Sequence, residues 1–203
     1  MSEPDARVEP DTQSAEYTRY LAERRGLRRL VDVQIPYRWN LRRLHLGRVL
    51  DVGCGIGRNL RALAPGSVGV DHNPHSIALC NRAGLEALVP ADFARAFAHR
   101  EATFDSLLCA HVVEHMTPSE AVELLGGYRR FLVPRGRAII ITPQEAGFRS
   151  DATHVTFCDF EANARLLRDS GFAVERAYSF PFPRAAGRVF AHNEFVTVGV
   201  ALD

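Results

Sequence analysis

The residues best suited to chemistry surround a glycine-rich turn in the first third of the chain. Residues 49–60 read Val-Leu-Asp-Val-Gly-Cys-Gly-Ile-Gly-Arg-Asn-Leu, with Asp51 near the end of a short apolar run and glycines at 53, 55 and 57. Glycine adopts positive φ cheaply, and because it has no Cβ a ligand can lie against its backbone. A buried strand that passes through this turn into a helix at 57–64 therefore predicts a ligand-binding loop.

The spacing of these residues argues against a phosphate loop. A dinucleotide fingerprint needs a glycine at position 58, where the chain has Arg58, and a P-loop needs a lysine, which the chain lacks. A second predicted strand, at 67–71, ends on Asp71, whose carboxylate can accept hydrogen bonds from two ribose hydroxyls. Asp51 lies near the loop, where it can meet an ammonium group. A ribose joined to an amino acid describes S-adenosyl-L-methionine.

Further blocks follow the glycine loop in a fixed order. They are Ala-Asp-Phe at 91–93, Phe-Asp-Ser-Leu-Leu-Cys-Ala at 104–110 running into His-Val-Val-Glu-His-Met at 111–116, and Leu-Val-Pro-Arg-Gly-Arg-Ala-Ile-Ile-Ile-Thr at 132–142. This ordered set resembles the class I (Rossmann-like) S-adenosylmethionine-dependent methyltransferases. The resemblance covers residues 49–142, and the remainder to 203 is compatible with it.

The resemblance implies a role for each residue at the ends of the predicted strands. The glycine loop and Asp51 would bind the methionine end of the cofactor and Asp71 the ribose. Asp92 would accept from the adenine amine beside the Phe93 amide, while Ala110 and His111 would border the sulfonium. His72 and Asn73 would be outer ribose contacts, although Asn73 and Asp92 are equally suited to cap helices. The predicted cofactor set is Asp51, Gly53, Cys54, Gly55, Gly57, Asp71, His72, Asn73, Asp92, Phe93, Ala110 and His111.

Alternating strands and helices must position these groups. We expect strands near 49–53, 67–71, 86–89, 104–110, 137–142, 172–179 and 194–201, and helices near 57–64, 74–83, 93–98, 118–131 and 159–170. This order predicts an α/β fold: a doubly wound, mostly parallel seven-stranded sheet with a reversed last strand and helices on both faces. Ligands in such sheets bind beyond the carboxyl ends of the strands.

The N-terminal region has a different composition. Residues 1–14 are acidic and contain little to bury, which predicts a disordered tail. Residues 15–203 are predicted to form a single methyltransferase domain, with two N-terminal helices at 15–46 interrupted by Pro36. This segment carries eight arginines against three acidic residues. It can be a solvated helical face, a lid over the cofactor or a nucleic-acid surface, and we predict a lid.

Two histidines are candidates for a general base. His111 follows the fourth predicted strand, and His154 lies in an irregular stretch, 143–158, after the fifth. An imidazole with an ordinary pKa suits this role at neutral pH. Glu114 and His115 are given a structural role. The stretch 143–158 and the aromatic segment 180–183 are expected to form the walls of the acceptor pocket.

We expect methyl transfer to an O or N atom of a small molecule, because the tetrapeptide after the fourth strand, 110–113, is Ala-His-Val-Val and not the Asn-Pro-Pro-Tyr type of amino-directed nucleic-acid methyltransferases. The alternatives are a methyltransferase acting on RNA or protein and a non-catalytic S-adenosylmethionine-binding protein.

Composition limits the other properties. The net charge is +1, and 46% hydrophobic with 24% charged residues is ordinary for a globular chain, so a nucleic-acid partner is not expected. The four cysteines are widely spaced, which suits the cytoplasm and predicts no metal site. No apolar run is long enough for a membrane span. The oligomeric state stays open.

Overall fold

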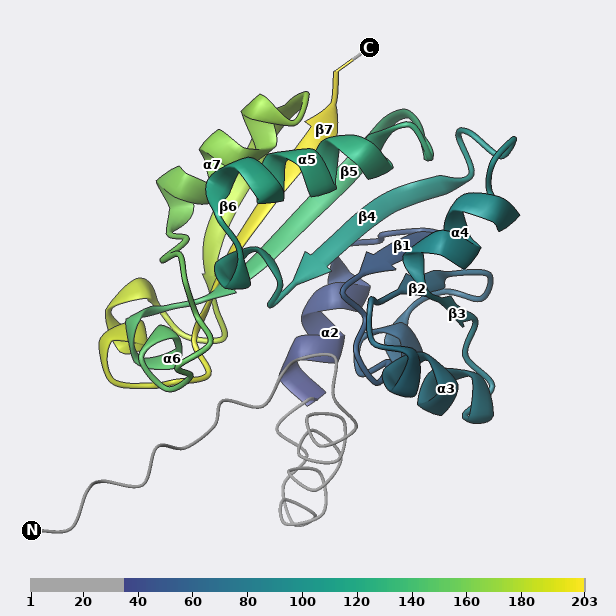
Figure 1. Ribbon diagram of the computed structural model, residues 1–203. Coiled ribbons are helices and arrows are strands. Elements are labelled where there is room, and N and C mark those ends of the chain that lie inside the picture. The colour runs from purple at the N-terminus through teal and green to yellow at the C-terminus, as the bar shows by residue number, and fades with distance from the viewer. Residues whose placement is uncertain (1–34, 203) are drawn as a thin grey trace, which may run out of the picture.

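A seven-stranded mixed sheet organises the protein (Figure 1). The computed structural model describes residues 35–202. The strand order is β3-β2-β1-β4-β5-β7-β6; neighbours from β3 to β5 pair in parallel, and β7 runs antiparallel between β5 and β6. The predicted sheet with its reversed last strand is confirmed. The strands are β1 (Val49–Val52), β2 (Val68–Val70), β3 (Ala87–Leu88), β4 (Phe104–Ala110), β5 (Leu132–Pro143), β6 (Phe172–Phe180) and β7 (Glu194–Ala201).

Helices cover both faces of this sheet. One face carries α4, α5 and α7, and the other carries α2 and α3 (Figure 1). Within residues 35–202, no helix combines the length and the apolar composition that crossing a membrane requires. The α-helices are α2 (Ile35–Arg43), α3 (Pro74–Arg82), α4 (Pro90–Ala96), α5 (Pro118–Arg129), α6 (Glu145–Phe148) and α7 (Phe160–Asp169), and the 3₁₀ helices are η1 (Leu60–Ala62), η2 (Val113–His115) and η3 (Arg184–Arg188).

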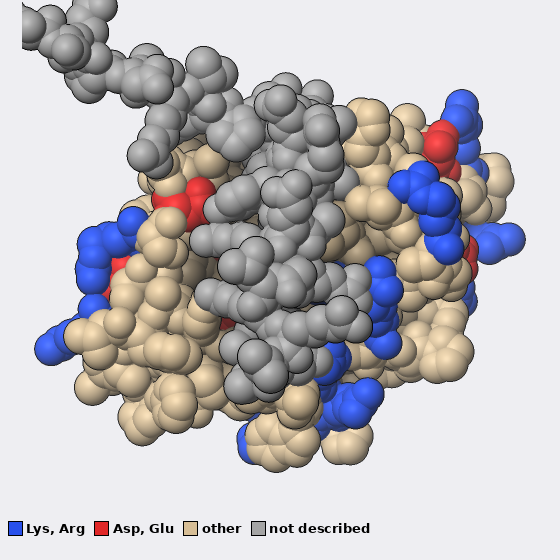
Figure 2. All heavy atoms as spheres, turned by 90° about the horizontal axis from the view of Figure 1, so that it is seen from below, with Lys and Arg blue, Asp and Glu red and all other residues tan. Residues whose placement is uncertain are grey.

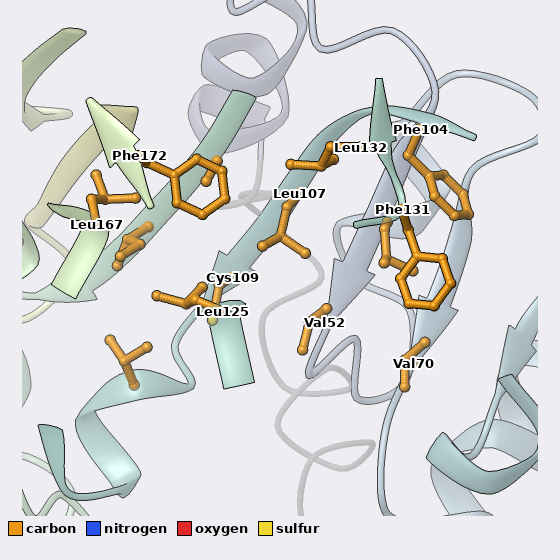
Figure 3. Packing of buried hydrophobic residues seen from close by; sticks show 14 of the residues in the cluster. Val52, Val70, Phe104, Leu107, Cys109, Leu125, Phe131, Leu132, Leu167 and Phe172 are labelled. Atoms are coloured by element: carbon orange, nitrogen blue, oxygen red, sulfur yellow. The ribbon is translucent and has the colours of Figure 1, made fainter. Parts of the chain in front are cut away.

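The larger core lies between the sheet and helices α4, α5 and α7. Alternate side chains of a strand point to opposite faces, so every second residue of the central strands enters this core. Figure 3 shows these strand residues directed toward the helix side chains that cover them. The residues labelled there include Val52, Val70, Leu107, Cys109, Leu125, Phe131, Leu167 and Phe172, all buried.

The second core binds α2 to the opposite face. Leu41 and Leu44 are buried against strand residues that include Leu108 and Ile139. The Tyr178 hydroxyl of β6 also donates to the Asn40 side chain at 2.9 Å. The described part of the predicted lid therefore contributes Leu41, Leu44 and Leu46 to the hydrophobic core. The predicted tail, 1–14, and most of the lid lie outside the described residues.

One predicted helix is much shorter than expected because of a proline. The helix expected at 57–64 is only the three-residue η1, because Pro65 disfavours a helical conformation at the residue before it and Leu63 is already extended. Pro36 lies in the first turn of α2, where its missing N–H would have no intrahelical acceptor. The helix predicted before Pro36 lies outside the described residues.

The parallel strands all end at one edge of the sheet, the lower edge in Figure 1. The central strand β1 has β2 on one side and β4 on the other, so the chain order reverses there. The connections after β1 and β4 consequently cross to opposite faces of the sheet, and open α/β sheets bind ligands at such a point.

Candidate active site

The glycine loop follows β1 directly. Gly53, Gly55 and Gly57 all have positive φ, at 74°, 52° and 75°. A Cβ on Gly53 would lie 2.2 Å from a methyl of Val112, so this glycine lets the loops after β1 and β4 pack together. A Cβ on Gly55 would meet nothing within 4 Å. Gly55 therefore borders open space, and its backbone is accessible to a ligand.

Asp51, at the end of β1, is buried and incompletely partnered. Its side chain is in a residue only 1% exposed, and Oδ2 has no hydrogen-bond partner among the described residues. Burial chiefly, with negative charge at Cys80 and Asp71, raises the pKa of Asp51 to about 8. A buried polar atom without a partner is costly, and a ligand ammonium would satisfy it. The site thus fits the amino-acid end of S-adenosylmethionine.

Asp71, at the end of β2, connects the glycine loop to the next helix. Its Oδ2 accepts from the Gly55 amide and its Oδ1 from the Asn73 amide, each at 2.8 Å. A carboxylate offers about four acceptor positions, so two stay available for hydroxyl groups. His72 places Nδ1 3.8 Å from Asp71 Oδ1. Asn73 is the N-cap of α3, because its side chain accepts from the amides of residues 75 and 76.

The thiols below the glycine loop also belong to this region. Cys80 Sγ lies 3.3 Å from the Gly55 carbonyl oxygen, and Cys54 Sγ lies 3.7 Å from the same atom. Both cysteines are buried and unbridged. Cys54, predicted as a cofactor contact, thus supports the loop from its core side.

Of the two residues expected to contact the adenine, Asp92 and Phe93, only Asp92 has polar atoms that a ligand can reach. The Phe93 amide donates to the Val89 carbonyl at 2.9 Å and its ring packs 4.6 Å from that of Phe97, so Phe93 does not offer its amide to a ligand. This corrects the prediction for Phe93. Asp92 is not the N-cap of α4, which is Val89. The Asp92 carboxylate is half exposed and pairs with Arg95.

His111, immediately after Ala110 at the end of β4, lies between two carboxylates. Its Nδ1 is 3.2 Å from Glu114 Oε1 and its Nε2 is 2.8 Å from Glu194 Oε1. Burial lowers the pKa of His111, but the two hydrogen-bonded carboxylates outweigh it and raise the pKa to about 10. The side chain is 46% exposed, which also limits the effect of burial. An imidazolium at neutral pH has no lone pair, so His111 is not suited to be the general base.

His154 lies in a different environment, beside residues that sequence reasoning treated as structural. Its Nδ1 is 2.8 Å from the Phe148 carbonyl oxygen, and its ring centroid is 4.8 Å from that of His115. One ligand atom each of Glu114, His115 and His154 lies within 4.8 Å of the others. No local sequence pattern predicts this cluster, because His154 is far along the chain from the other two.

The two segments expected to surround the acceptor lie next to each other. Arg184 of η3 pairs with Glu145 of α6, and Arg149 Nη2 donates to the Arg188 carbonyl at 3.1 Å. A buried amide, Gln144, strengthens the junction, since its Nε2 donates to the Ser179 hydroxyl at 2.7 Å. No sequence motif singles out Gln144. Exposed aromatic rings stand on these segments, namely Phe157 and Phe182.

A separate cleft of about 520 Å³ lies between α4 and α5. Its lining includes Phe93, Met116 and Tyr128, but no residue of the glycine loop and neither Asp51 nor Asp71. This cleft therefore lies apart from the glycine loop.

The sheet order, the glycine loop at the switch point and the paired carboxylates of β1 and β2 define the class I methyltransferase fold. Residues 50–140 match a family described as a methyltransferase domain. The chain thus has the class I methyltransferase fold, and over residues 50–140, a little under half of its length, it is similar to that methyltransferase family. No curated protein matches its sequence.

Solved structures show the same fold at low sequence identity. A TehB-like methyltransferase from Corynebacterium glutamicum has a TM-score of 0.68 at 20% identity, over 93% of this chain and 100% of that one. A 1,6-didemethyltoxoflavin-N1-methyltransferase from Burkholderia thailandensis, with 1,6-didemethyltoxoflavin and S-adenosylhomocysteine bound, has a TM-score of 0.59 at 20% identity, over 100% of this chain and 99% of that one. The magnesium protoporphyrin IX methyltransferase of Synechocystis PCC 6803, with S-adenosylhomocysteine bound, has a TM-score of 0.62 at 15% identity, over 94% of this chain and 96% of that one.

Proposed function

We propose that the protein transfers the methyl group of S-adenosylmethionine to an O or N atom of a small-molecule acceptor. The observation that carries the cofactor assignment is the orphaned Oδ2 of Asp51 beside the open face of Gly55. Asp51 would bind the ammonium, and the remaining acceptor positions of Asp71 would bind the ribose. The bound cofactor supplies a methyl group made electrophilic by its sulfonium.

The acceptor side supports a small molecule of partly apolar character. Phe148 stacks on His154, with centroids 5.2 Å apart, and contacts Phe157 edge-on at the same separation. Phe182 similarly contacts Phe190 at 5.3 Å. Aromatic rings on adjoining loops are typical of small-molecule pockets, in which a few polar groups fix the orientation of the ligand. The structural relative that binds 1,6-didemethyltoxoflavin is consistent with this choice.

The chain's own residues then have to align the acceptor and exclude water, which is most of what this transfer requires. His111, held between Glu114 and Glu194, fixes the loop after β4 beside Ala110. His154 keeps Nε2 for a proton or a ligand, because its Nδ1 is occupied by a carbonyl. Asp92 is the acceptor that we propose for the adenine amine.

A nucleic-acid acceptor has weaker support. The most basic segment of the sequence lies largely outside the described residues. Outside the grey atoms, the face in Figure 2 carries Arg side chains in several groups, with Asp and Glu also present. No single-sign surface is evident in this visible part, so we do not assign a polyanion to it.

The experiment is calorimetry followed by a screen. We expect S-adenosylmethionine and S-adenosylhomocysteine to bind, and NAD not to bind, because Arg58 replaces the glycine that a pyrophosphate needs. Labelled cofactor is then incubated with fractionated small molecules, with RNA and with protein. Binding of NAD alone would overturn the cofactor assignment, and labelling confined to RNA or protein would overturn the small-molecule acceptor.

A further inference from the structure

A three-residue cluster at the carboxyl edge has features that methyl transfer alone does not require. Glu114 and His115 belong to η2, after β4, and His154 belongs to the loop after α6. Backbone hydrogen bonds hold the two segments together: the amides of Val155 and Thr156 donate to the Glu114 carbonyl at 2.7 and 3.0 Å. The side chains are buried or half-buried, and one ligand atom of each lies within 4.8 Å of the others.

The two histidines are oriented in the same way. His115 Nδ1 lies 3.1 Å from the Thr153 carbonyl oxygen, and His154 Nδ1 lies 2.8 Å from the Phe148 carbonyl oxygen. A carbonyl oxygen can only accept, so Nδ1 is the donor in each contact, and in the neutral imidazole this leaves the lone pair on Nε2. A backbone carbonyl on the far nitrogen is the usual support for a histidine that binds a metal.

Glu114 supplies the anionic member of the cluster. Its side chain is 0% exposed, and Oε1 is 3.2 Å from His111 Nδ1. Its Oε2 is buried and has no hydrogen-bond partner among the described residues. If the cluster only joined two loops, the hydrogen bonds at the two Nδ1 atoms would be enough to do so. The buried Oε2 of Glu114 would then lack a hydrogen-bond partner, which costs free energy of folding. A cation at the centre of the cluster would satisfy it.

We propose that Glu114, His115 and His154 bind a divalent transition-metal ion. Two imidazoles and one carboxylate suit zinc, iron or cobalt better than magnesium or calcium, which prefer oxygen ligands. Binding draws the three atoms to about 3.4 Å from one another, the separation set by bonds of about 2.1 Å in a tetrahedral site. Small rotations of the half-buried histidine rings accomplish this closure. His111, bridging Glu114 to Glu194, supports the carboxylate from outside.

Three protein ligands leave a coordination position for an acceptor oxygen. The ion lowers the pKa of a bound hydroxyl, which loses its proton to water. The oxygen–carbon bond then forms as the carbon–sulfur bond breaks, and the sulfonium becomes a neutral thioether. His154 is in this case a ligand and not a base. This catalytic role rests on the proposed function, whereas metal binding does not.

The test of binding uses the full chain, stripped with a chelator and without cofactor. Calorimetric titration with Zn²⁺ should show one ion per chain, and Co²⁺ should give the visible absorption of a site with nitrogen and oxygen ligands. Glu114→Gln and His154→Gln should each weaken Zn²⁺ binding by at least about tenfold. His99→Gln, at an exposed histidine outside the cluster, is the matched control and should bind as the wild type does. Melting curves without metal check that each variant is folded.

Absence of stoichiometric Zn²⁺ binding, or equal binding by the folded Glu114→Gln and His154→Gln variants, would overturn the metal site. Methyl transfer is measured separately, before and after metal removal and with metal restored. Loss and recovery would support the catalytic role. Transfer indifferent to the chelator would overturn that role, while failure to bind S-adenosylmethionine would overturn the proposed function without affecting the metal titration.

Discussion

Among single residues, Asp71 combines two roles. Its carboxylate accepts hydrogen bonds from two backbone amides, and we propose that it also accepts hydrogen bonds from the ribose. Asp71→Asn keeps one acceptor oxygen for the loop but removes the charge. Losing charge-assisted hydrogen bonds of about 1.5–3 kcal/mol each should raise the Kd for S-adenosylhomocysteine at least about tenfold, as measured by calorimetry. Glu175→Gln, on the exposed part of β6, should leave the Kd unchanged. An unchanged Kd in Asp71→Asn would place the ribose elsewhere.

The raised pKa of Asp51 predicts that cofactor binding releases a proton. Its pKa is raised to about 8, so it is mostly protonated at neutral pH before the cofactor binds. A bound ammonium favours the carboxylate and lowers this pKa, so binding should release a proton at neutral pH and progressively less as the pH rises through about 8. Calorimetry in two buffers with different ionisation enthalpies measures this release. Asp51→Asn should release none, and equal release by the variant would assign the proton to another group.

The same carboxyl affects stability in the opposite sense to a salt-bridged aspartate. The folded pKa of Asp51, about 8, lies above its model value of 3.8, so its contribution to stability is complete below about pH 4 and is lost between about pH 4 and about pH 8. The cofactor-free protein should therefore lose stability over this interval, and Asp51→Asn should flatten the dependence seen in thermal melting. A variant that follows the wild-type curve would contradict the buried carboxyl as its source.

The glycine loop provides the prediction at the scale of elements. Gly55 and Gly84 both have positive φ and open space where a Cβ would lie, but only Gly55 borders the proposed cofactor. Alanine at either position should cost a similar free energy of unfolding, about 1–2 kcal/mol, because of the left-handed backbone. Only Gly55→Ala should also weaken S-adenosylhomocysteine, measured by calorimetry beside melting curves. Equal cofactor affinity in both variants would remove Gly55 from the binding surface.

Local patterns predicted most elements and the position of the glycine loop beside Asp71. The strand, glycine turn and Asp71 lie within one short stretch, so their geometry follows from local backbone preferences. The helix at 93–98 was misplaced because Pro90 begins α4 earlier, a position that suits proline. The strand at 137–142 begins instead at Leu132, since the chain continues through an irregular register opposite Phe104.

The acceptor half was predicted less well because its contacts join distant parts of the chain. Glu194 reaches His111 only because β7 enters the sheet beside β5. His154 meets His115 only because two loops are fastened by backbone hydrogen bonds. Neither pairing follows from a local sequence pattern, and the raised pKa of His111 could not be inferred without it.

At the scale of the whole molecule, the lid over 15–46 is a prediction that hydrogen exchange can test. Residues 35–46 already contribute to the core, so we expect S-adenosylhomocysteine to leave their exchange unchanged. Closure of a lid should slow exchange in residues 15–34 together with the glycine loop at 53–57. Protection at the glycine loop alone would exclude a lid that responds to the cofactor.

The insertion of β7 between β5 and β6 has a consequence for synthesis on the ribosome. The order β3-β2-β1-β4-β5 can assemble while the chain is still emerging, because each of these strands pairs with one made earlier or soon afterwards. By contrast, β6 pairs only with β7, so it has no place in the sheet until residues 194–201 have left the exit tunnel. Until then β5 presents an unpaired apolar edge, the kind of surface that chaperones shield. The glycine loop and the strands that carry it can thus form before β6 and β7 join the sheet.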